Sequence, residues 1–197
     1  DRLVRAGIIP GSQSNYVTAA GISGKTLGLV GVGGIGRAVA RRALGFPLRV
    51  IYHDPRRLVA EEEQQLGLTW MPFDELLASA DYVSLHANLS PGTRHLIGAR
   101  QFNLMKPTAF LINTSRGPIV DEAALIRALT ERRIAGAGLD VFEHEPGINP
   151  VLLGLPNTVI TPHMGSAVGE LRAAMANVAV DNIIAVLDGK QPPNCWN

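Results

Sequence analysis

Short apolar runs recur along the chain, and segments whose apolar residues have helical spacing separate them. Apolar runs bounded by turn residues predict buried strands, whereas a spacing of three or four residues predicts helices with one buried face. The predicted strands cover residues 27–30, 48–53, 68–71, 82–86, 109–113, 137–141 and 158–161, and the predicted helices cover residues 37–44, 61–66, 73–77, 121–132 and 167–187. This alternation favours right-handed crossovers and one parallel sheet in doubly wound order, so the predicted fold class is α/β.

Two segments fall outside the alternation. Residues 1–23 contain Gly, Pro and small polar residues and predict a loop-rich lead-in, and residues 143–156 predict a loop that carries Pro and Gly. Asp121 is the predicted N-cap of the helix that follows it.

The first predicted strand and helix are joined by the sequence Gly-Val-Gly-Gly-Ile-Gly at residues 31–36. On a strand-to-helix turn, each glycine of a G-x-G-x-x-G pattern has a physical task. Gly31 makes the tight turn, Gly33 lets a diphosphate approach the backbone, and Gly36 lets the helix pack closely on the strand. The helix N-terminus then offers free N–H groups and the positive end of its dipole to an anion.

Asp54 follows the second predicted strand, where a carboxylate can accept both ribose hydroxyls of the adenosine half of NAD. Glycines, strand, helix and acid together predict a Rossmann dinucleotide-binding domain. Asp54 repels a 2′-phosphate and favours NAD, but Arg56 and Arg57 come next and leave NADP open as an alternative.

Ligands of such sheets bind beyond the C-terminal ends of the strands. That rule predicts a single rim built from separate strand ends. The rim comprises Gly31, Gly33, Gly34, Ile35, Gly36, Asp54, His86, Ala87, Thr114, Ser115, Arg116, Asp140 and His163.

Three residues have the chemistry that a nicotinamide cofactor requires of its partner groups: Arg116, Glu145 and His163. Histidine titrates near neutral pH, so it can give a proton to a nascent alkoxide or take one from a hydroxyl. A neighbouring carboxylate favours the charged imidazolium, and the arginine fork matches a substrate carboxylate. Taken singly, each is more often an ordinary surface side chain. Their joint placement after separate strands favours a 2-oxo or 2-hydroxy acid site.

Composition narrows the remaining classes. The 197 residues include 18 basic and 17 acidic side chains, with a formal net charge of +1, and 46% are hydrophobic. This balance implies no nucleic-acid or membrane surface, and no apolar run has the length of a membrane span. Cys195 is the single cysteine, which excludes an intramolecular disulfide and favours a reducing, cytoplasmic setting. We expect no metal.

From about Gly24 to the C-terminus, the chain resembles the D-isomer-specific 2-hydroxyacid dehydrogenases. Four motifs in order carry the resemblance. They are SGKTLG at 23–28, INTSRGPIVD at 112–121, GLDVFEHEP at 138–146 and TPHMGS at 161–166.

The resemblance implies a role for each site residue. Arg116 would anchor the substrate carboxylate and carbonyl, His163 would be the general acid/base, and Glu145 would pair with His163. Asp140 would hold the nicotinamide carboxamide. Gly34 and Ile35 would meet the diphosphate, and Ala87, Thr114, Ser115, Arg116, His163, Gly165 and Ser166 would line the cofactor cleft.

The chain departs from the family pattern in three respects. Gly34 stands where many relatives have arginine, and Asn88 replaces a common proline. The substrate domain that normally lies on the N-terminal side is absent. We therefore expect a lead-in at 1–23, a dinucleotide-binding domain at 24–165, and a C-terminal helix and tail at 166–197 that return toward the absent domain. A fragment of this kind is expected to be inactive by itself.

The function implied is an NAD-dependent oxidoreductase that acts on a small 2-oxo acid such as glyoxylate or hydroxypyruvate, as a homodimer. Two alternatives stay open. One is an NAD(H)-sensing module that resembles the C-terminal-binding-protein corepressors, which share the fold and the site residues. The other is a short-form D-3-phosphoglycerate dehydrogenase.

Overall fold

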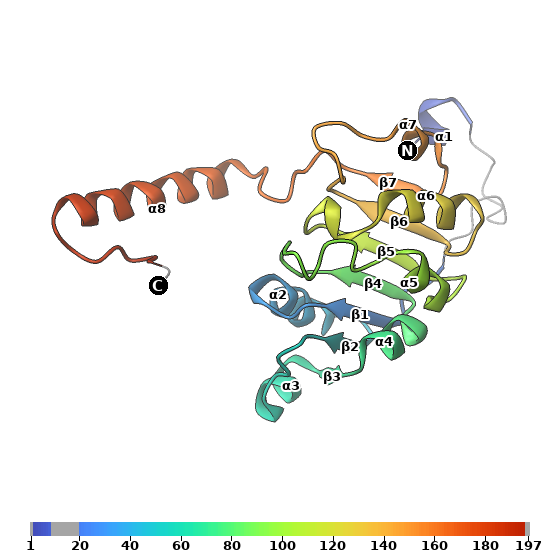
Figure 1. The fold of residues 1–197 in the computed structure, drawn as a ribbon, viewed down its shortest axis with the longest axis horizontal. Helices are drawn as coiled ribbons and strands as arrows, with labels where there is room; N and C mark the ends of the chain where they lie inside the picture. Colours follow the sequence, from blue (N-terminus) through green and yellow to red (C-terminus); the bar gives the residue numbers. More distant parts are fainter. Residues whose placement is uncertain (1, 9–19, 196–197) are drawn as a thin grey trace.

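The computed structural model describes residues 2–8 and 20–195 of the chain. Within them, seven strands form one parallel sheet in the order β3-β2-β1-β4-β5-β6-β7 (Figure 1). The strands are β1 (Thr26–Val30), β2 (Arg49–His53), β3 (Leu68–Trp70), β4 (Tyr82–Leu85), β5 (Phe110–Asn113), β6 (Gly136–Leu139) and β7 (Thr158–Ile160). The predicted doubly wound α/β fold is confirmed.

The direction in which the sheet grows reverses at β1. Strands β2 and β3 extend from one of its edges, and β4 to β7 extend from the other. Val30, the last residue of β1, pairs in register with His53 of β2 and with Leu85 of β4. The crevice beyond these three strand ends is the topological switch point, where α/β sheets of this kind bind ligands.

Successive strand residues point to opposite faces of the sheet. Helices cover both faces around β1 and β2, whereas one face of β5 to β7 is open, and Val159 of β7 is 70% exposed there. Leu29 and Tyr52 belong to the apolar cluster on the side of α2 and α3, whereas Val30 and Ile51 belong to the cluster on the side of α4, α5 and α6. The covering helices are α2 (Gly34–Ala43), α3 (Ala60–Leu66), α4 (Phe73–Ser79), α5 (Ala99–Leu104) and α6 (Glu122–Thr130).

The last helix, α8 (Gly169–Leu187), projects away from the sheet and its covering helices (Figure 1). None of its residues is buried, although it carries many apolar side chains. Among the described residues, no helix combines the length and the apolar character needed to cross a membrane.

Three short helices were not predicted. The segment predicted as a loop at 143–156 contains α7 (Pro150–Gly154), and the lead-in contains α1 (Arg2–Arg5). Residues 9–19 of the lead-in lie outside the described residues. No element was assigned between 88 and 108, where α5 lies. For α7 the missed signal is local: Asn149 Oδ1 accepts a hydrogen bond from Val151 N at 3.1 Å, which caps a helix that begins with proline.

Helix boundaries differ modestly from those predicted. α2 begins at Gly34 rather than at Arg37, so the last glycines of the turn already belong to the helix. α6 ends at Thr130 rather than at Arg132, whose φ of 57° is left-handed and cannot continue a helix. The cap predicted for α6 is confirmed, because Asp121 Oδ1 accepts a hydrogen bond from Ala124 N at 3.0 Å.

Candidate functional site

The glycine turn requires glycine at two positions. Gly31 has φ of +92°, and a Cβ added there would lie 2.9 Å from the backbone nitrogen of Ala87. A Cβ on Gly36 would lie 2.2 Å from the carbonyl oxygen of Gly31, so only glycine lets α2 begin this close to β1. A Cβ on Gly33 or Gly34 would meet nothing within 4 Å. The outer side of the turn therefore has room for a diphosphate beside the first N–H groups of α2.

Asp54 follows β2, and its carboxylate ties that strand end to the glycine turn. Oδ2 accepts a hydrogen bond from Val32 N at 3.0 Å, and Oδ1 accepts one from Arg56 N at 2.9 Å. The carboxylate is thus held beside the turn by two backbone donors. Asp54 also lines a neighbouring cavity, and each of its oxygens keeps a lone pair with which it could accept a ribose hydroxyl.

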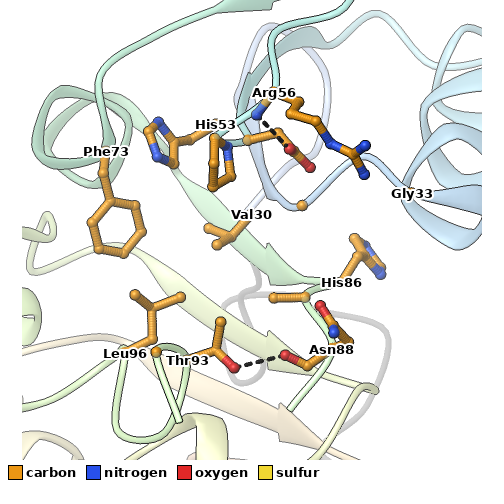
Figure 2. A pocket seen from close by; sticks show the side chains of 14 residues that line it. Val30, Gly33, His53, Arg56, Phe73, His86, Asn88, Thr93 and Leu96 are labelled. Atoms are coloured by element: carbon orange, nitrogen blue, oxygen red, sulfur yellow. Dashed lines mark hydrogen bonds between the residues drawn. The ribbon is translucent and has the colours of Figure 1, made fainter. Parts of the chain in front are cut away.

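A cavity of about 510 Å³ lies at the switch point, beyond the ends of β1, β2 and β4 (Figure 2). Val30, Phe73 and Leu96 give it apolar walls, and Gly31, Gly33, Asp54 and Ala87 also line it. Apolar walls suit an adenine ring, and an acid beside an open glycine turn suits the attached ribose and diphosphate. The cavity therefore fits the adenosine half of a dinucleotide.

His86 follows β4 directly and also lines this cavity. Its Nε2 is 2.9 Å from Ser84 Oγ, while its buried Nδ1 has no hydrogen-bond partner among the described residues. Burial lowers the pKa of the His86 imidazole, which favours the neutral ring at pH 7. His86 therefore closes the inner wall without adding a charge.

The loop after β5 is shaped by Asn113, whose side chain is 1% exposed. Asn113 Oδ1 accepts from Ser115 N at 3.1 Å, and its Nδ2 donates to Arg116 O at 3.0 Å. Ser115 Oγ donates to Leu85 O at 2.8 Å, which fastens the loop to the end of β4. Thr114 and Arg116 remain exposed on this loop, and Arg116 Nη1 donates to Ser115 O at 2.7 Å.

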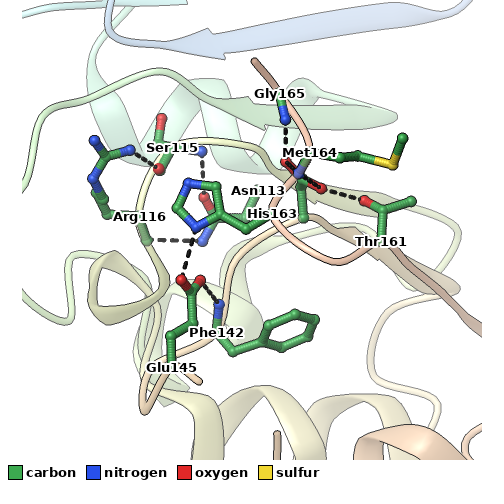
Figure 3. Close-up of polar contacts among 10 residues, drawn as sticks. Asn113, Ser115, Arg116, Phe142, Glu145, Thr161, His163, Met164 and Gly165 are labelled. Atoms are coloured by element: carbon green, nitrogen blue, oxygen red, sulfur yellow. Dashed lines mark hydrogen bonds and ion pairs between the residues drawn. The ribbon is translucent and has the colours of Figure 1, made fainter. Parts of the chain in front are cut away.

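His163 and Glu145 form a direct pair at the β6–β7 end of the rim (Figure 3). Nδ1 of His163 lies 2.7 Å from Oε2 of Glu145, and Oε1 of Glu145 accepts from Phe142 N at 2.9 Å. Partial burial would raise the pKa of the Glu145 carboxyl, but the bonds from His163 and Phe142 and the charge of Arg116 outweigh it and lower the pKa. Glu145 is thus a fixed negative charge that orients the imidazole.

The backbone at His163 is unusual. Its φ of 49° lies in the left-handed region, which non-glycine residues seldom adopt. Because Nδ1 is engaged by Glu145, Nε2 is the ring nitrogen left for a ligand.

Asp140 holds the loop that carries His163. Its carboxylate accepts hydrogen bonds from Thr161 Oγ1, from Met164 N at 3.0 Å and from Gly165 N at 3.1 Å. Burial would raise the pKa of the Asp140 carboxyl, but these three donors and nearby His163 hold it below its ordinary value. The ionised Asp140 therefore anchors the loop on both sides of His163.

The predicted site residues fall into two groups along one rim. Gly31, Gly33, Asp54 and Ala87 line the cavity, whereas Arg116, Glu145 and His163 lie outside it at the β5–β7 end. Gly34 and Ile35 begin α2 with open surroundings, and Gly165 and Ser166 follow His163 on the anchored loop. This division fits a dinucleotide whose adenosine half fills the cavity while its other half reaches His163 and Glu145.

Sequence reasoning missed several residues that shape the rim. They are Phe73 and Leu96 in the cavity wall, Asn113 at the end of β5, and Glu143, which accepts a hydrogen bond from Glu122 N. A polar residue that closes an apolar strand is a signal that could have identified Asn113. The other three act through contacts between distant segments, which no local pattern reveals.

A parallel sheet with a switch-point cavity, a glycine turn onto a helix and an acid after β2 defines a dinucleotide-binding domain of the Rossmann class. The rim adds the histidine, carboxylate and arginine of a dehydrogenase-like site.

Residues 1–165 match the family model described as D-isomer specific 2-hydroxyacid dehydrogenase, NAD binding domain. The chain belongs to this family, and the predictions of the family and of NAD as cofactor are confirmed.

Known relatives agree with this assignment. The chain is 50% identical over 177 residues to the glyoxylate reductase of Thermococcus litoralis, covering 90% of this chain and 53% of the relative. The crystal structure of a glyoxylate reductase from Paecilomyes thermophila has a TM-score of 0.86 and 39% identity, covering 96% of this chain and 57% of that one. That of D-lactate dehydrogenase with NAD+ from Lactobacillus jensenii has a TM-score of 0.85 and 32% identity, covering 100% and 62%. The chain therefore spans about half the length of the curated relatives it matches.

Proposed function

We propose that this chain is the cofactor-binding part of an NAD-dependent D-2-hydroxyacid dehydrogenase that reduces a small 2-oxo acid such as glyoxylate or hydroxypyruvate. The observation that carries the proposal is the His163–Glu145 pair, 2.7 Å apart on the same rim as the dinucleotide cavity. The similarity to glyoxylate reductases at 50% identity supports the choice of substrate class.

His163 is the proposed general acid and base. With Nδ1 held by Glu145, the proton on Nε2 is the one delivered to the keto oxygen during reduction. In the oxidative direction the same nitrogen takes the proton from the substrate hydroxyl. The fixed charge of Glu145 stabilises the imidazolium in both directions.

Arg116 is the proposed anchor of the substrate. Its exposed guanidinium stands on the loop after β5, close enough to Glu145 for its charge to be felt there. A planar fork of donors suits the 2-oxo carboxylate and can also polarise the adjacent carbonyl. When bound, the nicotinamide supplies or accepts the hydride at the substrate carbon, and Asp140 and the loop at 114–116 are proposed to orient it.

The test combines binding with turnover. We expect the chain itself to bind NADH, and the full-length enzyme that contains it to oxidise NADH with glyoxylate or hydroxypyruvate. In His163→Ala, the initial rate should fall by about 10²- to 10⁴-fold while the Kd for NADH stays unchanged. No turnover with any of a panel of 2-oxo acids, despite tight NADH binding, would contradict the enzyme proposal.

We further propose that the complete enzyme is a cytoplasmic homodimer. The resemblance to dimeric family members supports the assembly, and a single cysteine in 197 residues supports a reducing compartment. Light scattering coupled to size exclusion measures the assembly directly, and a monomer at micromolar concentration would contradict it.

A further inference from the structure

A second cavity, of about 370 Å³, neighbours the first and shares Gly33, Asp54 and Arg56 with it. Its lining includes three arginines, Arg37, Arg56 and Arg57, together with Asp54 and Glu62. Positive side chains beside the adenosine ribose are what a 2′-phosphate on that ribose would require. Whether they can serve it depends on what each guanidinium already binds.

The guanidinium of Arg57 is bound by Glu63 of α3. Arg57 Nε donates to Glu63 Oε1 at 2.9 Å, and Nη2 donates to Oε2 at 3.0 Å, which is a bidentate pair. The guanidinium also lies over the ring of Trp70, 5.7 Å from its centroid. The Arg57 side chain is 62% exposed, so without a partner it would sample many rotamers in water. The ion pair with Glu63 therefore sets the direction of its guanidinium.

Glu63 is itself held in place by Tyr52 of β2. Its side chain is only 13% exposed, and Oε1 accepts a hydrogen bond from the hydroxyl of Tyr52 at 2.8 Å. The same hydroxyl accepts from Leu58 N at 2.8 Å, so Tyr52 links Glu63 to the backbone that follows Arg57. Burial and Glu63 raise the pKa of Tyr52 to about 12, which keeps its hydroxyl protonated as a donor.

Arg37 is bound in a similar way. Its guanidinium pairs with both carboxylate oxygens of Glu62 and donates to Val32 O. Among the described residues, Arg56 is the one of the three arginines whose side chain makes no hydrogen bond or ion pair. Two of the three arginines that line this cavity are therefore already paired with carboxylates.

We infer that Glu63 biases cofactor choice: by pairing with Arg57, it withholds one of the two arginines that follow Asp54 from a 2′-phosphate, which favours NAD over NADP. The inference rests on the proposed function, because it refines the cofactor of the same site. Asp54 repels the phosphate directly, whereas Glu63 acts at a distance by withholding a partner.

The experiment measures Kd for NADH and NADPH by calorimetry on the chain and on variants of it. In Glu63→Gln, which keeps the shape of the side chain and an acceptor for Tyr52, affinity for NADPH should rise about tenfold while the NADH Kd stays within about twofold. Glu61→Gln is the matched control. It removes the same charge two residues earlier on α3, from an exposed side chain that makes no hydrogen bond or ion pair with a described residue, so it should leave both constants unchanged.

A double variant tests the mechanism. Adding Arg57→Leu to Glu63→Gln should abolish the gain for NADPH, because the released arginine is the proposed ligand. A gain that survives without Arg57, or an equal gain in Glu61→Gln, would show a general charge effect and overturn the inference. Unchanged NADPH affinity in a Glu63→Gln chain that still binds NADH would overturn the inference alone. Failure of the unmodified chain to bind NADH would overturn the proposed function and the inference with it.

Discussion

Asp140 shows how one carboxylate can organise a functional loop. It is 6% exposed, and its oxygens accept hydrogen bonds from Thr161, Met164 and Gly165, residues on both sides of His163. Such bonds to an ionised acceptor are stronger than those between neutral groups. The position of His163 therefore depends on the charge state of Asp140.

Replacing Asp140 by Asn should lower the free energy of unfolding at pH 7 by about 1–3 kcal/mol, because the new amide turns a donor toward backbone N–H groups. The pKa of Asp140 is lower in the folded chain than in the unfolded one, so its contribution exists above the unfolded pKa and is lost as pH falls through the folded one. The difference between the two chains should therefore shrink below about pH 4. Urea titrations of both chains at pH 7 and at pH 3 measure this difference.

Asp188→Asn is the control for this prediction. Asp188 pairs with Lys190 at 3.0 Å on an exposed surface, so its loss should cost less than about 0.5 kcal/mol. A loss in Asp140→Asn that is the same at pH 7 and at pH 3 would contradict a role for the ionised carboxylate.

For single residues, the sequence indicates which side chains could take part in chemistry better than it indicates which side chains hold them in place. The glycine turn, Asp54 and His163 are identifiable because their residue types fit few other tasks at a strand end. The anchors Asn113, Asp140 and Glu63 act through hydrogen bonds to partners elsewhere in the fold. Partners of this kind become visible only when the chain has been folded.

Between elements, Glu143 joins three segments near the site. Its carboxylate lies 2.6 Å from His95 Nε2 and 3.1 Å from Arg94 Nη2, both on the segment between β4 and α5. It also accepts from Glu122 N at the start of α6, while Glu122 Oε2 accepts from Glu143 N, each at 3.1 Å. The segment between β4 and α5, helix α6 and the loop that carries Glu145 thus meet at the Glu143 side chain, which is 8% exposed.

At pH 7, Glu143→Gln should therefore lower the free energy of unfolding by about 2–3 kcal/mol. The reason is that Arg94 and His95 lose the buried carboxylate that they contact. Burial would raise the pKa of Glu143, but His95 and the Glu122 N–H lower it, so this contribution disappears as pH falls below the ordinary range of a glutamate. Hydrogen exchange should quicken at residues 88–97, four of which line the cavity, and NADH should bind several-fold more weakly.

The exposed pair Asp74–Arg100 supplies the matched control. Asp74→Asn should leave exchange at 88–97 unchanged. If Glu143→Gln also leaves exchange there unchanged, the three segments do not depend on this contact.

The element order was predictable because buried parallel strands are continuous apolar runs, and all seven were recognised at nearly their observed bounds. Short helices were not. α5 and α7 have six and five residues, too few to show a periodic apolar face. Such helices form because the tertiary structure buries Phe102 and Leu152, not because of their own propensity.

For the molecule as a whole, every buried residue of the described chain lies at or before Thr158, and α8 contains none. A chain that ends at Ala167 should consequently keep its Tm within about 2 °C, because little buried surface is removed. Its NADH affinity should also be unchanged. Scanning calorimetry and calorimetric titration test both expectations, and a drop in Tm of more than about 5 °C would show that α8 packs on the body.

At His163, the left-handed backbone favours one residue for stability and the proposed chemistry requires another. Glycine would adopt φ of 49° at no steric cost, yet only an imidazole can shuttle a proton at that point. Part of the folding free energy is therefore given up where the reaction is proposed to occur, and the bonds around Asp140 and Glu145 restrain the result. A search for stabilising substitutions that ignored catalysis would select against the residue on which the proposed activity depends.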